Sequence, residues 1–418
     1  MTKEENERLC RVGRGTPAGE LFRSVWLPAV RSSQIPEPRS APVRLKLLGE
    51  ELVAFRDGSG KPGIVQAKCA HRRAPLFFGR VEERGLRCSY HGWVFDRDGQ
   101  CIDIPSVPNK DVWNKMQIRS YRVEEKADIV WIFMGEGEPP ALPKFPWIDL
   151  PQSRRIASVW LQEANWLQGV EGEIDTAHIA VLHKTNKSAT RAHRHYTFKD
   201  PSPVLSAHDT KIGFMSVARR NADDKYYWRV TQWMAPMFSF VPSADWPIGG
   251  RAWVPVDDYN TYTWDFTYSA SDLQPEFFDV FKRGAAFPPE IAYQPVKLNT
   301  GAIVDTWRPV RNRDNDYLVD RSLQGASHTT GILGINDQDR AVQEGMDPIT
   351  DRSEERLVAS DRTVVEARRR LLAIIESQET IQRFRDLVRD GTAYAVEPLD
   401  VVSPTADAAA FLAEARLV

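Results

Sequence analysis

The chain has 418 residues, and because a single hydrophobic core rarely grows beyond about 250–300 residues, two domains are expected. Its 55 basic and 57 acidic side chains are interspersed and leave a formal net charge of −2, which argues against a nucleic acid as a partner. No apolar run approaches the roughly 18–20 residues that span a bilayer, and the start MTKEENERLC lacks the layout of a signal peptide. We therefore expect a cytoplasmic protein without a membrane partner.

The first part of the chain contains short β segments. Between residues 43 and 140, runs such as VRLKLLGEELVAFRD, GLRCSYHGWVFD and ADIVWIFMG are separated by glycine-rich and charged turns, which predicts a compact, mostly antiparallel β domain. Residues 1–42 are expected to form an N-terminal segment that packs on the second domain. The proline-rich stretch at 141–158 disfavours both a helix and a central strand, so it is predicted to be the linker.

The second domain, residues 159–390, is predicted to be α+β. A helical stretch at about 162–183 is followed, at about 195–268, by a β-rich segment in which aromatic residues alternate with others, and then by helices. Apolar residues with near-helical spacing beside an arginine-rich face predict one of these helices at about 361–376. Residues 391–418 are interpreted as a C-terminal tail that ends in a short helix.

Two short loops of the β domain each supply one thiol and one imidazole. Cys69 and His71 form C-x-H, and after sixteen further residues Cys88 and His91 form C-x-x-H. A Rieske 2Fe–2S centre needs two thiolates on one iron and two histidines on the other, and two facing hairpin loops can deliver that set. The sequence thus predicts a 2Fe–2S cluster. The alternative is a structural zinc site, which also uses two cysteines and two histidines.

The residues around this motif favour the cluster. Gly92 permits a tight turn after the second histidine, and the ring of Trp93 can shield a cluster from water. Cys10 and Cys101 have no partner at ligand spacing and are interpreted as ordinary residues, because four cysteines in a cytosolic chain of this size do not indicate a disulfide framework.

A second metal motif begins the second domain. The run NWLQGVEGEIDTAHIAVLH contains D-x-x-H at Asp175 and His178, followed after four residues by His183. On a helix, Asp175 and His178 share a face, whereas His178 and His183 are about 140° apart. Both histidines can therefore reach one ion only if the helix bends or ends near His183. The polar residues after His183 favour a helix that ends there. Read in isolation, the two histidines are also compatible with ordinary core positions.

Two histidines and one carboxylate make a facial triad that leaves positions on Fe(II) open for O₂. The carboxylate must come from later in the chain. Asp339 is our choice, because its D-x-x-x-x-E pattern opens a predicted helix whose first turn could carry the ligand. Asp361 has the same spacing and is the alternative, and Asp337 is a third candidate.

The two motifs together resemble those of the Rieske non-haem iron aromatic-ring oxygenases, over nearly the whole chain. The opening LCRVGRGTPAGELFRSVWLPA and the later TTGILGINDQD with QEGM resemble more narrowly the phthalate dioxygenase-type subgroup of terminal oxygenase α-subunits. The resemblance implies an N-terminal Rieske domain joined to a helix-grip catalytic domain, in which an antiparallel sheet is combined with helices. It also implies a homotrimer or a hexamer of two stacked trimers.

The resemblance implies roles for individual residues. It assigns His178, His183 and Asp339 to the mononuclear iron. It makes Asp175 the bridge that carries electrons between a cluster histidine of one subunit, His91, and the iron site of the next. A cyclic trimer can close that circuit, and an isologous dimer cannot. The chain has no glycine-rich nucleotide fingerprint, so electrons from NAD(P)H are expected to come through a separate flavin and iron–sulfur reductase.

The resemblance points to an aromatic carboxylate and O₂ as substrates. Ring dihydroxylation, monohydroxylation and O-demethylation use the same metal apparatus, and the sequence does not choose among them. A buried carboxylate needs an arginine or a similar donor. Candidates in the β-rich stretch are Arg219, Arg220 and Arg229, with Arg194 and His195 behind them.

A departure from the subgroup pattern bears on the substrate. In the phthalate enzymes a basic residue follows the aromatic of a similar Gly-Phe pair, whereas here Gly213 and Phe214 are followed by Met215. This favours an aromatic acid other than phthalate itself, including a methoxylated one.

Two other classes of function compete with the oxygenase. A Rieske electron carrier needs no second iron, so the second motif would be idle in it. A zinc-stabilised binding module would have neither iron site.

Overall fold

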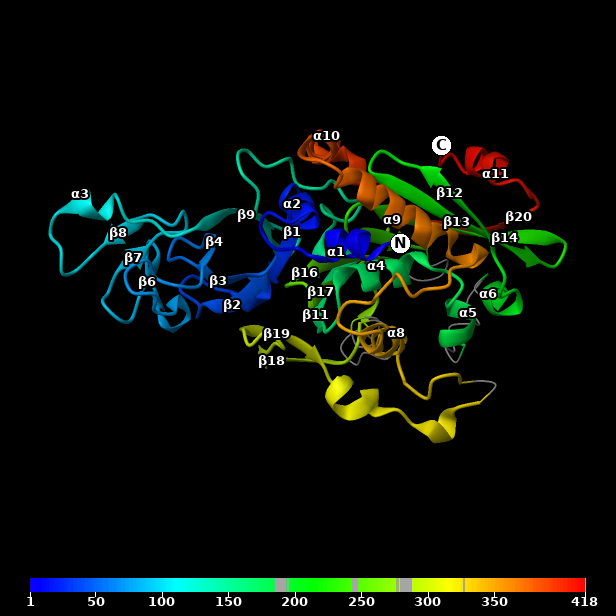
Figure 1. Ribbon diagram of the computed structural model, residues 1–418, viewed down its shortest axis with the longest axis horizontal. Helices are drawn as coiled ribbons and strands as arrows, with labels where there is room; N and C mark the ends of the chain where they lie inside the picture. The colour runs from blue at the N-terminus through cyan, green and yellow to red at the C-terminus, as the bar shows by residue number, and fades with distance from the viewer. Residues whose placement is uncertain are drawn as a thin grey trace.

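The computed structural model describes residues 1–184, 193, 195–242, 247–275, 278, 288–325 and 328–417. Figure 1 shows an elongated molecule in which a smaller β domain projects, at the left, from a larger domain of sheet and helices. This arrangement matches the α+β class and the domain order that the sequence predicts.

The β domain is built on a six-stranded antiparallel sheet. In spatial order its strands are β1 (Trp26–Arg31), β10 (Ile129–Phe133), β9 (Ser120–Lys126), β4 (Pro62–Gln66), β3 (Glu50–Arg56) and β2 (Val43–Leu47). Strand β1 corrects the expected boundary at residue 43, because its residues pair with β10 from Trp26 opposite Phe133 to Arg31 opposite Ile129. Every residue of β10 is buried, which explains why this sheet recruits a strand from the N-terminal segment.

A smaller four-stranded sheet forms the far end of this domain. Its strands are β5 (Arg80–Val81), β6 (Leu86–Arg87), β7 (Val94–Phe95) and β8 (Cys101–Asp103), with helix α3 (Lys110–Trp113) beside it. A separate hydrophobic core lies between this sheet and strands β3 and β4. The two predicted ligand loops emerge from this end of the molecule.

The predicted linker is part of the large core. Phe145 and Trp147 are buried, their rings stack 5.5 Å apart, and Trp147 stacks on Phe266 of the catalytic sheet. Strand β11 (Arg155–Gln162) begins inside the range expected to be linker. The prolines prevent regular structure before this strand, but the apolar side chains between them fasten the segment to the second domain.

Ion pairs also hold the two domains together. Lys46 on β2 contacts Asp257 at 2.7 Å, and both side chains are buried. Arg44, on the same strand, donates two hydrogen bonds to Asp305 at 3.0 and 2.6 Å. Asp305 lies on β19 (Ile303–Pro309), which forms a hairpin with β18 (Ile291–Lys297).

The catalytic domain is an eight-stranded antiparallel sheet. Its path runs from β11 through β17 (Thr261–Tyr268), β16 (Ile248–Pro255), β15 (Phe238–Val241), β14 (Lys225–Met234) and β13 (Gly213–Ala222) to β12 (Val204–Asp209). The eighth strand, β20 (Leu399–Ser403), pairs with β14. The expected C-terminal tail therefore belongs to the catalytic sheet, and its helix α11 (Ala408–Glu414) stacks Phe411 on Trp228 of β14 at 4.5 Å.

Helices cover and fill this sheet. They are α4 (Trp166–Ile174), α5 (Ile179–Leu182), α6 (His195–Lys199), α8 (Ile335–Gly345), α9 (Arg362–Ile374) and α10 (Gln378–Val388). Helix α4 packs against β15 and β16, which is the helix-grip arrangement, and α9 agrees with the helix predicted at 361–376. No helix in the described part of the chain is both long and apolar enough to cross a membrane.

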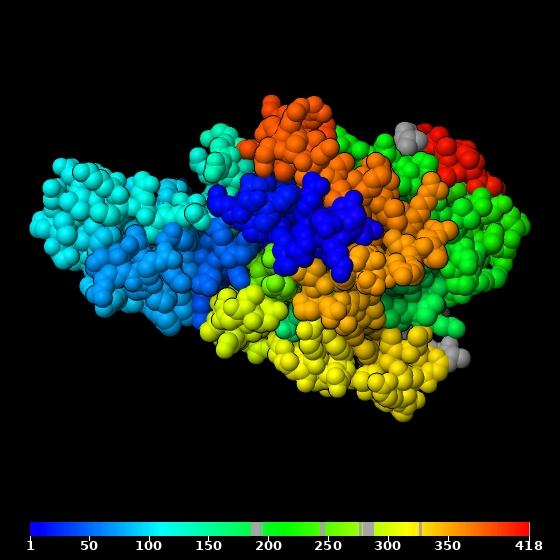
Figure 2. Space-filling view, in the orientation of Figure 1, coloured from blue at the N-terminus to red at the C-terminus, as the bar shows by residue number. Residues whose placement is uncertain are grey.

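The first part of the N-terminal segment, which precedes β1, lies on the catalytic domain. Helices α1 (Lys3–Cys10) and α2 (Pro17–Arg23) form the blue surface that Figure 2 shows beside the orange helices. The indole of Trp166 on α4 donates to the carbonyl of Leu9 at 3.1 Å. The segment therefore reaches the helix that precedes the second metal motif.

Candidate iron sites

The two ligand loops of the β domain face each other at its tip. Cys69 and Cys88 are buried at 1% and 2% exposure, whereas His71 and His91 are exposed, with their ring centroids 4.5 Å apart. Each loop is closed by backbone hydrogen bonds, including Cys69 N–H to the Ala74 carbonyl at 2.9 Å. Two thiols point inward and two imidazoles outward, and this donor set fits a Rieske 2Fe–2S cluster.

The flanking residues contribute as the sequence suggests. Gly92 has φ +77°, a conformation that favours glycine, and it follows His91 in a turn closed by a hydrogen bond from its N–H to the Cys88 carbonyl at 3.0 Å. The indole of Trp93 stacks on the His71 ring at 4.7 Å and 3°. Burial, and to a lesser degree the nearby Cys88, raises the pKa of the Cys69 thiol to about 11, so the paired thiolates need a metal to balance their charge.

The second motif does not lie on one continuous helix. Helix α4 ends at Ile174, Asp175 is its extended C-cap with φ −70° and ψ 119°, and His178 is the N-cap of the short helix α5. The expectation that Asp175 and His178 share a helical face is therefore wrong. The break turns the two histidines toward each other, and α5 ends at Leu182, immediately before His183.

Three candidate ligands converge on one point. The Nε2 atoms of His178 and His183 lie 3.2 Å apart, and Asp339 Oδ1 lies 3.6 Å from His178 Nε2 and 3.2 Å from His183 Nε2. Among the described residues these three side chains form the one group of histidine, cysteine and carboxylate donors whose ligand atoms all lie within 4.8 Å of one another. Two imidazoles and one carboxylate fit a mononuclear Fe(II) with open positions.

The other nitrogen of each histidine is held by a neighbour. His178 Nδ1 lies 3.2 Å from Asp175 Oδ2, and His183 Nδ1 lies 2.8 Å from Gln338 Oε1. Gln338 Nε2 donates to the Ile332 carbonyl at 2.8 Å, so its oxygen must face His183. Both acceptors require a proton on Nδ1, which leaves the lone pair of each Nε2 for a metal.

The electrostatics of the group suit a cation. Burial acts to raise the pKa of Asp339, but the charge of His183 and the hydrogen bond to it outweigh burial, so the pKa lies below its ordinary value. Burial acts to lower the pKa of His178, yet the hydrogen bond to Asp175 and the negative charges around it raise that pKa. The carboxylates thus favour positive charge where the three ligand atoms meet.

The alternative carboxylates lie elsewhere. Asp337 is buried and forms an ion pair with Arg340 at 3.1 Å. Asp361 accepts from the N–H of Val358 at 2.7 Å, at the start of α9. Asp339 is the fifth residue of α8, so it lies in the second turn and not in the first turn as expected.

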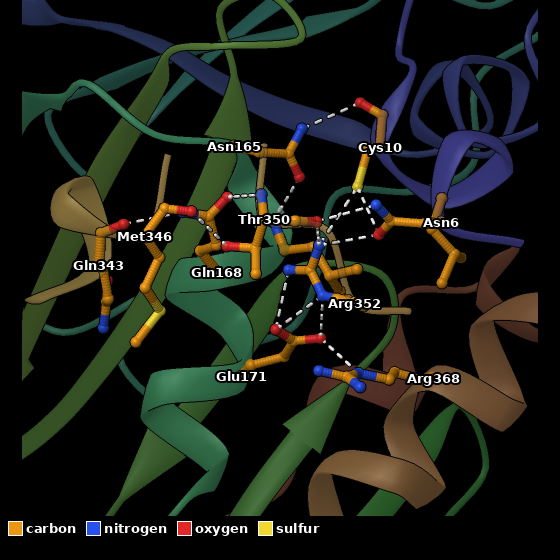
Figure 3. Close-up of polar contacts among 12 residues, drawn as sticks. Asn6, Cys10, Asn165, Gln168, Glu171, Gln343, Met346, Thr350, Arg352 and Arg368 are labelled. Carbon is orange, nitrogen blue, oxygen red and sulfur yellow. Dashed lines mark hydrogen bonds and ion pairs between the residues drawn. The ribbon is translucent and has the colours of Figure 1, made fainter. Parts of the chain in front are cut away.

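A buried network fixes the end of α4 (Figure 3). Glu171 accepts from Arg352 at 2.8 Å and from Arg368 at 2.6 Å, and Arg352 has no exposed surface in its side chain. Arg352 also donates to Asn6 at 3.0 Å and contacts the sulfur of Cys10 at 3.4 Å. Segments from α1, α4 and α9 thus meet at Glu171, whose carbonyl accepts from the N–H of Asp175. Cys10 is a packing residue, as expected.

Glutamine side chains join α4 to the helix that carries Asp339. Gln168 Nε2 donates to the carbonyl of Gln343 at 2.8 Å, and Gln162 Nε2 donates to the side-chain oxygen of Gln343 at 2.7 Å. A Cβ atom added to Gly172 would lie 2.2 Å from Gln343 Nε2, so the helical glycine leaves room for this amide. The spacing between the histidines and Asp339 is thereby fixed by the fold.

The candidate ligands face a cavity inside the sheet. Besides these ligands and Asp175, its lining includes Trp160, Gln162, Gly169, Glu173, Arg229, Val241, Arg251, Trp253, Thr263 and Arg340. The sequence reasoning missed Arg251, which contacts Glu173 at 2.6 Å and Asp265 at 3.7 Å. Burial raises the pKa of Asp265 to about 7 despite Arg251. Nothing in the sequence reasoning indicated Glu173, Arg251 or Asp265 as part of the site.

The predicted substrate arginines divide by the face of the sheet. Arg229 lines the cavity, and Arg220, one strand away on the same face, is buried and donates to the Thr176 carbonyl at 2.8 Å. Arg219 points to the opposite face and contacts the carbonyl of Ala406 and the ring of Tyr226, so it is excluded from the cavity. Successive residues of a strand alternate faces, which explains the difference. His195 lies on α6, and Arg194 lies outside the described residues.

A β domain with a cluster-type donor set, followed by a helix-grip domain with two histidines and a carboxylate, defines a two-centre iron oxygenase. Comparisons with known proteins agree. The protein-family model described as "Rieske [2Fe-2S] domain" matches residues 25–122. The family model described as "LigXa C-terminal domain like" matches residues 132–388.

Similar proteins cover nearly the whole chain. The chain is 38% identical to the 3-chlorobenzoate-3,4-dioxygenase oxygenase subunit of Comamonas testosteroni, over 91% of this chain and 89% of that one. It is 34% identical to the phthalate 4,5-dioxygenase oxygenase subunit of Pseudomonas putida, over 89% and 85%. The structure of NdmA with caffeine, from Pseudomonas putida CBB5, shares the fold with a TM-score of 0.60 at 19% identity, covering 93% of this chain and 99% of that one.

The chain therefore belongs to the Rieske non-haem iron oxygenases, as a terminal oxygenase subunit of the phthalate dioxygenase type. It is an oxidoreductase whose cofactors are a Rieske 2Fe–2S cluster and a mononuclear iron, and it needs a separate reductase or ferredoxin as its electron donor. The electron-carrier and zinc-module alternatives are not supported.

Proposed function

We propose that this subunit hydroxylates an aromatic carboxylate with O₂, with Cys69, His71, Cys88 and His91 as the cluster ligands and His178, His183 and Asp339 as the iron ligands. The observation that carries the proposal is the meeting of two imidazole Nε2 atoms and one carboxylate oxygen at the edge of an internal cavity. When bound, the cluster stores an electron and the iron activates O₂.

The surrounding residues prepare the site for this chemistry. Asp175 and Gln338 hold the protons on the Nδ1 atoms, so that both histidines present their Nε2 atoms as ligands. Trp160, Trp253 and Val241 give the cavity wall apolar surface, against which an aromatic ring would lie. Which carbon is oxidised depends on how the ring is held, so ring dihydroxylation, monohydroxylation and O-demethylation all use these residues.

We propose that electrons cross between subunits of a homotrimer, alone or stacked as a hexamer. Figure 1 places β6, β7 and β8, the strands next to the cluster loops, toward the left end of the molecule, and α5 and α8 in the larger domain to the right, away from them. His71 and His91 are exposed, and a surface hollow that reaches Asp175, His178 and Asp339 is lined by Val342, Met346 and Leu357. These apolar side chains support docking of a neighbour's Rieske domain there, with Asp175 as the bridge.

An aromatic acid is proposed as the substrate because both similar oxygenase subunits are named for one, a chlorobenzoate and a phthalate. Electrons are proposed to start from NAD(P)H and to reach the cluster through a flavin and iron–sulfur reductase.

The metal assignments are tested by iron and sulfide analysis with electron paramagnetic resonance of the dithionite-reduced protein. We expect about three irons and two sulfides per chain and a Rieske signal. His183→Ala should lose one iron and keep the Rieske signal, whereas Cys88→Ser should lose the signal. Zinc without sulfide, or full iron in His183→Ala, contradicts the assignments.

Complementation tests the path of electrons. His183→Ala keeps a cluster, Cys88→Ser keeps a mononuclear iron, and equal co-expression gives mixed trimers. If electrons cross from each subunit to the next in a cyclic trimer, about one junction in four pairs an intact cluster with an intact iron, so activity should recover to about a quarter of wild type. Transfer within one chain gives no recovery and overturns the trimeric circuit.

A further inference from the structure

We propose that Arg229 is the residue that selects a carboxylate substituent on the substrate, by direct contact within the iron cavity. The inference rests on the proposed function, because it names the part of the substrate that the same cavity recognises. It is carried by the distribution of charge among the arginines that line this cavity.

Three arginines line the cavity, and two of them are neutralised. Arg251 contacts Glu173 at 2.6 Å and Asp265 at 3.7 Å. Arg340 contacts Asp337 at 3.1 Å and Glu344 at 3.2 Å. Each of these two guanidinium groups therefore has two carboxylates beside it, and neither needs a ligand to balance its charge.

Arg229 differs from both. It is 5% exposed, and in the described part of the chain no carboxylate lies within 4.0 Å of its guanidinium. Its Nη1 donates to the carbonyl of Pro242 at 3.2 Å, and its Nε has no hydrogen-bond partner among the described residues. The phenol oxygen of Tyr227 also contacts the guanidinium of Arg229, and its hydroxyl donates to Asp400 at 3.0 Å, so the groups that Arg229 touches directly are neutral.

A buried charge without a partner destabilises a folded protein, and truncating or pairing it relieves that cost. A guanidinium with no carboxylate beside it and an unpartnered Nε, at the wall of a substrate cavity, is suited to an anion that enters with the substrate. Its planar fork of donors matches a carboxylate, which it can bind through two parallel hydrogen bonds. The geometry therefore points to an aromatic acid whose ring lies between Arg229 and the iron ligands.

Arg220 shares the face of the sheet with Arg229 but uses its donors differently. Its Nη2 donates to the carbonyl and to the hydroxyl of Thr176, and its Nε donates to the carbonyl of Asp200 at 3.1 Å. Thr176 lies between Asp175 and His178, so Arg220 is a positioning residue for the second metal motif. Arg220 Nη1 also has no hydrogen-bond partner among the described residues, but Arg220 is not among the residues that line the cavity, and this difference leaves Arg229 as the substrate contact.

The experiment measures binding of matched acid and amide probes to the purified, iron-loaded protein by calorimetry. The probes are 3-chlorobenzoate, 3-methoxybenzoate and phthalate, together with their carboxamides. We expect the wild type to bind at least one acid about 10–100-fold more tightly than its amide, as a charge-assisted pair of hydrogen bonds allows. Arg229→Met should reduce this ratio to near one, and Arg229→Lys should restore part of it.

Arg219→Met is the matched control, because it removes the same side chain from the opposite face of the same sheet. It should keep the wild-type ratio. The Rieske signal and iron content of each variant report whether it has folded, and the wild-type ratio tests the inference even if Arg229→Met does not fold.

Three results overturn the inference while the oxygenase assignment stands. The wild-type protein binds acids and amides equally, it binds none of the acids, or the Arg229→Met variant keeps the wild-type ratio. Loss of the oxygenase assignment has a different signature, namely a protein without a Rieske signal or without the third iron.

Discussion

Replacing Gln338 by leucine tests how the mononuclear site is held together. The amide oxygen of Gln338 lies 2.8 Å from His183 Nδ1, and its Nε2 is anchored 2.8 Å from the Ile332 carbonyl. Leucine has a similar volume but no acceptor, so the proton on Nδ1 loses its partner and the imidazole can rotate or change tautomer. Substitutions of this kind weaken metal binding by about 10–100-fold, or about 1.4–2.7 kcal/mol.

The assay is equilibrium binding of Fe(II) by the iron-depleted protein in competition with a chelator, with the Rieske signal as an internal measure of folding. Gln338→Glu is the matched control, because it keeps an acceptor for His183. It should bind Fe(II) at least about tenfold more tightly than Gln338→Leu. Unchanged affinity in Gln338→Leu refutes the reasoning about the tautomer, and unchanged affinity in His183→Ala as well refutes the ligand assignment.

Three further predictions concern stability. Gly169→Ala should lower the free energy of unfolding by about 1–2 kcal/mol in urea, because the added Cβ would lie 2.1 Å from the indole of Trp253, whereas Gly345→Ala, with nothing within 4 Å, should not lower it. The pKa of Asp265 is about 7 in the folded protein and about 3.8 in the unfolded chain, so unfolding releases a proton between about pH 4 and 7. The free energy of unfolding therefore falls as the pH rises through that window. Asp265→Asn should reduce the slope by up to about 1.4 kcal/mol per pH unit, and an unchanged slope contradicts the burial argument. Glu171→Gln should cost about 3–5 kcal/mol in the same urea titration, because two buried arginines lose their shared carboxylate, and a loss below 1 kcal/mol would show that the network is not needed.

Local sequence patterns were sufficient to predict the features that depend on residues close together in the sequence. The loops at Cys69 and Cys88, the turn at Gly92 and the helix at 361–376 follow from spacing and side-chain type, and the structure has them where expected. The break after Ile174 could not be read in this way, because the surrounding text is compatible with a continuous helix. The last turn of the helix before this break carries Glu171, whose partners Arg352 and Arg368 come from two distant segments of the chain.

The sequence by itself determined the class of protein, because the cysteines and histidines at 69–91 and the two histidines at 178 and 183 occur at short spacings that few other functions require. Only the tertiary structure decided which carboxylate joins the histidines, that Gln338 orients His183, and that Arg229 and not Arg219 faces the cavity. Those relations depend on which strand faces which helix. These contacts arise from burial and pairing between residues far apart in the chain, so no local sequence pattern predicts them.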